Sequence, residues 1–206
     1  QRGGVLPIGH TVALTYNLKR PLRPRLGPDE GRGEGSESVP FDHYSEFDSP
    51  KTIEALAGAL RAGGHTVHLV EATEDLPRWF LSHEVDVVFN IAEGFGGAHR
   101  ESQVPAVLEA LRVPFTGSSS FTLALALDKA KTKQLLAHDG LPTPAWQLFA
   151  SPTDTLNPKL HFPLIVKPNC EGSAKGILRE SVVKDEPALR RQVERVLARY
   201  HQAALV

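Results

Sequence analysis

The sequence predicts an α/β fold, with an open, mostly parallel sheet over residues 1–119 and an incomplete α+β lobe over residues 120–206. In the first part, short apolar and β-branched runs alternate with segments of helical spacing, which is typical of βαβ units. In the second part, a glycine loop lies between apolar runs and needs a returning strand. The chain stops inside an apolar run at 203–206, so we expect the second lobe to be incomplete.

The first part contains four expected strands, at 11–16, 65–70, 85–90 and 113–116. Three expected helices lie between them, at 50–62, 76–81 and 100–111, each with apolar residues at helical spacing. Gly63 and Gly64 are expected to end the first helix, because glycine permits positive φ. Residues 17–49 are rich in proline, glycine and charge, and we expect a long, mobile excursion with little core.

The second part begins with an expected helix at 120–138 that is broken or bent near Asp128 and Lys129. Further strands are expected at 146–149, 162–167 and 181–183. A helix at 187–200 places leucine and valine on one face before the final apolar run.

Composition excludes several classes of protein. The net charge of −1 offers no basic excess for nucleic acid, and no apolar run is long enough to predict a membrane span. The single cysteine, Cys170, cannot form an internal disulfide, which fits a reducing, cytoplasmic location. The sequence contains no methionine, so we expect the natural chain to begin before Gln1.

The strongest chemical signal is a lysine at the end of an apolar strand, followed by a glycine loop. Burial of an unpaired Lys167 ammonium would be costly, and a bound polyphosphate would remove that cost. Glycines at 172 and 176 let backbone amides close around the same anion, which predicts a nucleotide site. The alternatives are that the Lys167 amine reaches water along the sheet and that the loop is an ordinary hairpin turn.

Lys129 is the second candidate. If Asp128 caps the next helix, Lys129 lies in its first turn, where the helix dipole disfavours a cation unless an anion is held nearby. The alternative is a solvated lysine that Asp128 compensates.

Other motifs give weaker signals. The glycine turn at 93–97 follows an expected strand, but Arg100 stands where a dinucleotide-binding turn has its third glycine. An oxidoreductase of the Rossmann type is therefore a weak alternative. The nine histidines show no metal-ligand spacing, and no metal ligand is expected among these residues. Neither Cys170 nor the serines at 118–120 have the setting of a nucleophile.

Three segments together resemble the D-alanine–D-alanine ligase branch of the ATP-grasp enzymes: 113–118, 128–136 with 140–144, and 164–168 with 171–173. Their order and spacing match that family over nearly the whole chain. The resemblance implies a pre-ATP-grasp, Rossmann-like domain at 1–119 and the first lobe of an ATP-grasp domain at 120–206, truncated at its C-terminus.

The resemblance also implies the roles of residues. Lys129 and Lys167 would contact the phosphates of ATP, and the loop would close over them through Glu171, Gly172, Ser173, Ala174 and Gly176. Ser173 would be the catalytic residue that helps to position the first amino-acid substrate. The implied reaction passes a phosphoryl group from ATP, with Mg²⁺, to a carboxylate, and an amine then displaces phosphate from the acyl phosphate. The Mg²⁺ ligands are expected beyond residue 206, so the chain alone is not expected to complete the reaction.

Departures from the family leave the substrate open. The usual glutamate-bearing turn after the first strand is replaced at 15–20, Glu93 stands in place of a histidine, and Ala174 replaces a serine. The expected partners are ATP and small amino-acid-like molecules, without nucleic acid or membrane. The family is commonly dimeric, which leaves a homodimer open. The main alternative is a non-catalytic nucleotide-binding or assembly module with a truncated grasp lobe.

Overall fold

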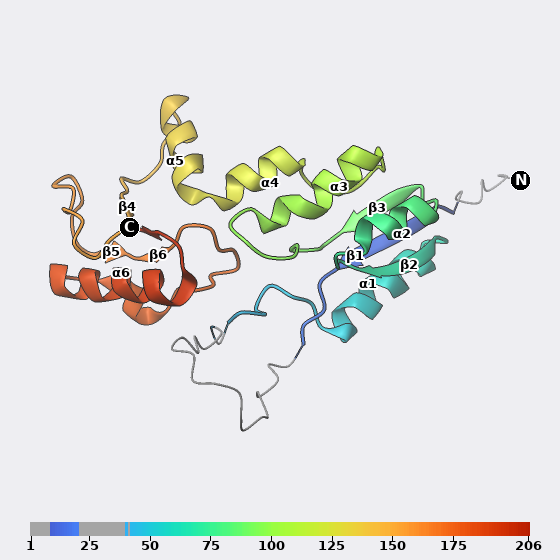
Figure 1. The fold of residues 1–206 in the computed structure, drawn as a ribbon, viewed down its shortest axis with the longest axis horizontal. Coiled ribbons are helices and arrows are strands. Elements are labelled where there is room, and N and C mark those ends of the chain that lie inside the picture. Colours follow the sequence, from blue (N-terminus) through green and yellow to red (C-terminus); the bar gives the residue numbers. More distant parts are fainter. Residues whose placement is uncertain (1–8, 21–39, 41) are drawn as a thin grey trace, which may run out of the picture. The chain divides into compact units, whose positions relative to one another are not determined.

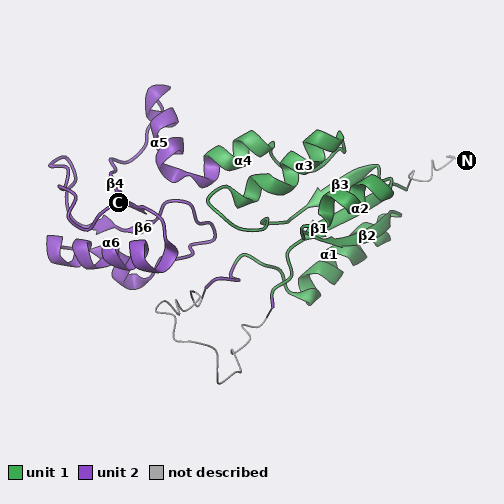
Figure 2. Cartoon of the chain, viewed as in Figure 1, with its two compact units in different colours: residues 1–19, 46–125 green, residues 20–45, 126–206 purple. Residues whose placement is uncertain are grey.

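The computed structural model describes residues 9–20, 40 and 42–206, which form two compact units. Unit 1 comprises residues 1–19 and 46–125, and unit 2 comprises residues 20–45 and 126–206 (Figure 2). Most of the expected excursion at 17–49 lies outside the described residues. The ends of that excursion meet in unit 1, where the Lys19 amide donates to the Asp48 carbonyl at 2.8 Å.

Unit 1 is built on a parallel sheet in the order β2-β1-β3, which confirms the predicted sheet type (Figure 1). The strands are β1 (Thr11–Tyr16), β2 (Thr66–Glu71) and β3 (Val87–Asn90). Successive side chains of a strand point to opposite faces, and accordingly Ala13 and Leu14 of β1 join two different clusters. Helices therefore have to cover both faces of the sheet.

One face is covered by α1 (Pro50–Ala62), through Ile53 and Ala57. Ser49 caps this helix by accepting from the Thr52 amide, and Pro50 at the first turn loses no hydrogen bond. The other face is covered by α2 (Leu76–Ser82) and α3 (Gln103–Leu111). The short helix η1 (Arg100–Ser102) precedes α3, so the predicted helix at 100–111 is a 3₁₀ turn followed by an α-helix.

The fourth strand predicted at 113–116 is wrong in extent, because only one parallel bridge forms, between Val88 and Phe115. The ladder of backbone hydrogen bonds stops there, because the Asn90 amide donates to the side-chain hydroxyl of Thr116 at 3.1 Å. Gly117, at φ 102°, then turns the chain away.

The predicted break near Asp128 is confirmed. It separates α4 (Ser120–Leu127) from α5 (Lys129–His138), and the Asp128 carboxylate caps α5 by accepting from the Lys131 amide at 3.0 Å. The two units divide inside α4, after Leu125, whereas the sequence analysis placed the boundary at 119.

Unit 2 contains two small antiparallel sheets and α6 (Glu186–Tyr200). The first sheet has the order β4-β8-β6, with β4 (Leu148–Phe149), β8 (Ala204–Leu205) and β6 (Lys167–Pro168). The second pairs β5 (Leu164–Ile165) with β7 (Val182–Val183), which follows the 3₁₀ turn η2 (Arg179–Ser181). The apolar face of α6 packs on the core of this unit through Leu189, Val193 and Val196.

The single strand predicted at 162–167 is thus split between two sheets. Ile165 pairs with Val182, whereas Lys167 pairs with Leu205 in the central strand of the other sheet. The buried Val166 lies at the change of partner, where its amide donates to the Ser181 carbonyl at 2.8 Å. Among the described residues, no helix is long and apolar enough to cross a membrane.

Candidate functional site

The first candidate site lies in unit 2, where the start of α5 meets the chain that leaves β6. Lys167 is half-buried in β6, and the buried Asn169 follows two residues later. The Asn169 side chain donates to the Asp128 carboxylate at 2.7 Å and accepts from the Ala130 amide at 2.9 Å. One asparagine therefore holds the first turn of α5 against the segment that carries Lys167.

Lys129, the first residue of α5, contacts the beginning of the glycine loop. Its amine donates to the carbonyl oxygens of Asn169, at 3.3 Å, and of Glu171. Its own amide also donates to the Asn169 carbonyl, at 3.2 Å. The first helical residue of α5 is thus joined to the loop through both its backbone and its side chain.

Lys133 of α5 also lies near these residues, although it was not among the residues predicted from the sequence. Its amine donates to the Thr143 hydroxyl at 2.6 Å and to the Pro144 carbonyl at 3.0 Å. Burial lowers the pKa of Lys133, and repulsion from the Lys167 ammonium lowers it further. Its spacing from Lys129 could have identified Lys133 from the sequence, because residues four apart share a helix face and Lys133 follows Lys129 by one turn.

The glycine loop at 171–176 has an exposed tip and two held ends. Ser173 and Ala174 are exposed at the tip, with φ of 46° and 58°, although L-residues disfavour this region. At the first end, the Glu171 carboxylate pairs with the Lys175 amine at 2.9 Å and accepts from Gln202 at 2.9 Å. The loop therefore neutralises its own carboxylate at this end, where the amine of Lys129 also contacts it.

The second end of the loop is Gly176, which is buried at φ 79°. A Cβ there would lie 2.4 Å from the Pro168 ring and 3.1 Å from the Tyr200 ring, so no other residue fits without displacement. The Gly176 amide donates to the Asp42 carboxylate at 2.7 Å, and its carbonyl accepts from Arg195 at 2.8 Å.

Three ammonium groups and a turn rich in positive φ make a chemical setting for a polyanion. Lysines supply the charge, and backbone amides in such turns can point toward phosphate oxygens. Among the described residues, the group of three carboxylates close enough to share a metal ion belongs to unit 1, so unit 2 shows no such set. Lys129 and Lys133 of α5 and Lys167 of β6 thus belong to unit 2, whereas the group of three carboxylates belongs to unit 1.

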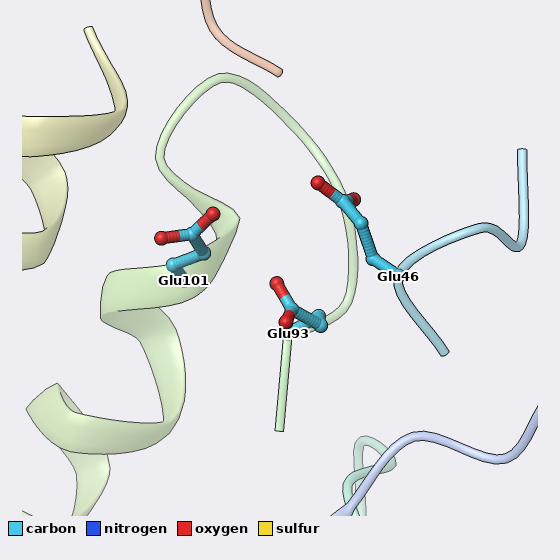
Figure 3. Close-up of side chains that lie close together, drawn as sticks. All are labelled: Glu46, Glu93 and Glu101. Carbon is cyan, nitrogen blue, oxygen red and sulfur yellow. The ribbon is translucent and has the colours of Figure 1, made fainter. Parts of the chain in front are cut away.

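The second candidate site lies in unit 1, where the carboxylates of Glu46, Glu93 and Glu101 converge (Figure 3). Glu93 follows β3, Glu101 lies in η1, and Glu46 comes from the segment before α1. One oxygen atom of each lies within 4.8 Å of the others, close enough to hold a cation together. Sequence reasoning missed this cluster, because its members lie on three separate segments.

Glu46 is already paired inside this cluster. The Nη2 atom of Arg100 donates to both carboxylate oxygens of Glu46, at 2.8 and 2.7 Å, and both side chains are less than 10% exposed. Burial of Glu93, together with the charges of Glu46 and Glu101, raises the pKa of Glu93 to about 7. Glu93 is therefore partly protonated near neutral pH.

These carboxylates line a pocket of about 410 Å³ at the carboxyl end of β3. Polar groups from Asn90, Thr116 and Ser118 also line it. The carboxyl ends of parallel strands are where open α/β sheets commonly bind ligands. The pocket is suited to a small cationic or amine-bearing molecule.

Several relatives of the chain carry the name D-alanine–D-alanine ligase. The chain is 38% identical over 139 residues to a D-alanine–D-alanine ligase of Methylococcus capsulatus, covering 66% of this chain and 44% of that protein. It is 38% identical over 130 residues to the ligase of that name from Aquifex aeolicus, covering 63% and 44%. An uncharacterized protein of Sinorhizobium fredii is 34% identical over 164 residues, covering 76% and 48%. No family model matches the chain.

Solved structures show the same likeness in fold. D-alanine–D-alanine ligase of Bacillus anthracis, in complex with ATP, has a TM-score of 0.65 at 20% identity and covers 96% of this chain and 57% of its own. The ligase of Coxiella burnetii has a TM-score of 0.60 at 17% identity, covering 96% and 60%. The chain is thus homologous to D-alanine–D-alanine ligases and shares part of their fold, which confirms the predicted ATP-grasp fold class. It spans less than half the length of the curated relatives it matches.

Proposed function

We propose, from this homology to D-alanine–D-alanine ligases, that the chain contributes the nucleotide phosphate site of an ATP-dependent carboxylate–amine ligase. The observation that carries the proposal is the arrangement of Lys129 and Lys167 beside one glycine loop in unit 2. Asn169 lies between them and holds the start of α5 to the end of β6.

The proposed chemistry assigns each residue a simple task. ATP supplies the phosphoryl group, and Lys129 and Lys167 stabilise negative charge on the phosphates while the amides of residues 172–176 surround them. Ser173 at the exposed loop tip positions the amino-acid substrate, and Lys133 adds to the positive charge beside Lys167. Mg²⁺ is part of the proposed chemistry as well.

A separate proposal concerns the pocket of unit 1, which we infer to bind an amine-bearing molecule. Glu101 and the ionised fraction of Glu93 attract a protonated amine, whereas Glu46 is already paired with Arg100. We propose small amino-acid-like substrates, and not D-alanine alone. The cytoplasmic location and the homodimer remain predictions.

The first test measures ATP binding. Lys129→Ala and Lys167→Ala are each expected to weaken ATP binding about ten- to hundredfold, as loss of a charge-assisted phosphate contact would. Isothermal titration of ATP into the chain measures this, and circular dichroism checks that each variant is folded. Lys159→Ala, which changes an exposed lysine of the same unit, is the matched control and is expected to bind as the parent chain does. Equal affinity of all three variants would remove the proposed phosphate site.

The second test measures the reaction. The complete gene product, with ATP, Mg²⁺ and paired amino acids, is expected to release ADP and phosphate only when a carboxylate and an amine substrate are both present. Release of no ADP with any pair, while ATP binding persists, would favour a non-catalytic nucleotide-binding module.

A further inference from the structure

Asp42 reaches the glycine loop from a distant part of the sequence. Its carboxylate accepts from the Gly176 amide at 2.7 Å, across 134 positions of the chain. The same carboxylate accepts from the Tyr200 hydroxyl, at 3.1 Å to one oxygen and 3.0 Å to the other. A residue that precedes α1 thus contacts both the end of the loop and the end of α6.

The peptide groups at Gly176 are held by opposite charges at their two polar ends. The carboxylate of Asp42 accepts from the N–H, and the guanidinium of Arg195 donates to the C=O at 2.8 Å. Hydrogen bonds to charged groups are stronger than bonds between neutral groups. The backbone at this position is therefore held from both sides.

The Tyr200 hydroxyl donates a hydrogen bond to Asp42 and so helps to hold its carboxylate in place. Burial, together with the hydrogen bond to the Asp42 carboxylate, raises the pKa of Tyr200 to about 12. The hydroxyl therefore retains its proton across the physiological range and continues to donate to the carboxylate.

Packing makes the position of Gly176 matter for the lysine site. Gly176 lies against Pro168, which directly follows Lys167 in β6. At the opposite end of the loop, the carbonyl of Glu171 accepts from Lys129. The loop thus begins at one candidate phosphate ligand and ends against the neighbour of the other, with Ser173 and Ala174 exposed between them.

We propose that Asp42 is a positioning residue that fixes the C-terminal end of the glycine loop, so that the loop tip is presented to the nucleotide phosphates from a held base. This inference rests on the proposed function for its nucleotide, whereas the anchoring itself is a property of the chain. Asp42 acts on the loop through the Gly176 backbone.

The test compares Asp42→Ala with Asp42→Asn in the full chain. Hydrogen–deuterium exchange at Gly176 and its neighbours is expected to accelerate about tenfold in Asp42→Ala, because the amide loses its charged acceptor. ATP affinity is expected to fall about three- to tenfold, since the loop base is no longer held. Asp42→Asn retains one carbonyl oxygen as an acceptor and should restore part of both effects.

Two matched variants separate anchoring from general damage. Asp139→Ala removes an exposed carboxylate of the same unit and should change neither exchange at Gly176 nor ATP affinity. Tyr200→Phe removes the second partner of Asp42 while leaving the Gly176 contact, so its effect on exchange should be smaller than that of Asp42→Ala.

The outcomes distinguish this inference from the proposed function. Unchanged exchange at Gly176 in both Asp42 variants would overturn the anchoring role, whether or not ATP binds. Faster exchange with unaltered ATP affinity would overturn the link to the nucleotide. If the parent chain itself failed to bind ATP, the proposed function would fail, and the exchange measurement would still decide the anchoring.

Discussion

The two glycine-bearing loops of this protein follow strands in different units and differ in what surrounds them. The loop at 93–97 follows β3 in unit 1 and lies beside three carboxylates. The loop at 171–176 follows β6 in unit 2 and begins at the amine of Lys129. Glycine turns of similar length thus lie beside carboxylates in one unit and beside a lysine in the other.

Each loop is held by a polar side chain from a distant segment. In unit 1 the side-chain oxygen of Asn17 accepts from the amides of Glu93 and Gly94, at 2.7 and 3.0 Å. In unit 2 the carboxylate of Asp42 accepts from Gly176. The neutral anchor lies where carboxylates already gather, and the anionic anchor holds the end of the loop that also contacts the guanidinium of Arg195. Glycine therefore permits the turn, and the neighbouring charges decide which ligand charge the turn can face.

The largest effect is expected from a side chain added at a buried glycine of either loop. A Cβ at Gly94 would lie 2.0 Å from the Arg100 carbonyl oxygen, and one at Gly176 would lie 2.4 Å from Pro168. Gly94→Ala and Gly176→Ala should each lower the free energy of unfolding by about 3 kcal/mol or more, from overpacking and positive φ together. Urea denaturation measures the loss.

Gly140→Ala is the matched control for this pair. Gly140 also has a positive φ of 71°, but nothing lies within 4 Å of its Cβ position. Its loss should be about 1 kcal/mol, the conformational part alone. Equal losses at all three positions would contradict the packing argument.

A smaller effect is expected from the neutral anchor. Asn17 is buried, and its side chain also donates to the Ala72 carbonyl at 3.3 Å. Asn17→Ala leaves these backbone groups without their partner and should cost about 2–3 kcal/mol of unfolding free energy. Asn157→Ala, which removes one exposed contact to the Lys159 amide, should cost less than about 1 kcal/mol. Thermal unfolding of both variants checks the ranking.

The smallest effect concerns the acidic pocket and depends on pH. The pKa of Glu93 is raised from 4.5 to about 7, so the folded chain keeps a proton there that the unfolded chain has lost. Stability therefore falls as pH rises from about 4.5 through about 7. Glu93→Gln removes this loss and should be more stable than the parent at pH 8 by about 2 kcal/mol, after allowance for solvent screening.

Glu109→Gln should show the opposite sign. Hydrogen bonds from the Ser120 hydroxyl and amide lower the pKa of Glu109, so its contribution is present above the ordinary pKa and is lost as pH falls. Unfolding measured from pH 4 to pH 8 distinguishes the two variants. A pH-independent difference between Glu93→Gln and the parent would contradict the burial of Glu93.

Local sequence was enough to predict most elements of the fold. The bounds of β1 and α1 match the prediction, because β-branched residues, Pro50 and the Gly63–Gly64 pair act within a few residues of themselves. The break at Asp128 was predictable for the same reason, since a capping aspartate needs only the next three residues. The strand at 113–116 was not, because the ladder is interrupted by the Thr116 hydroxyl, a contact across 26 positions.

The sequence by itself determined the candidate nucleotide residues, because each of them is recognisable from its near neighbours in the chain. Glycine freedom, a lysine in an apolar strand and a capped helix are properties that adjacent residues impose on each other. Only the tertiary structure brought Asp42 to Gly176 and placed Lys133 close enough to Lys167 for the two charges to repel each other. It also gathered Glu46, Glu93 and Glu101 around one pocket. Such contacts join segments tens of residues apart, and only packing of the whole unit decides which of them meet.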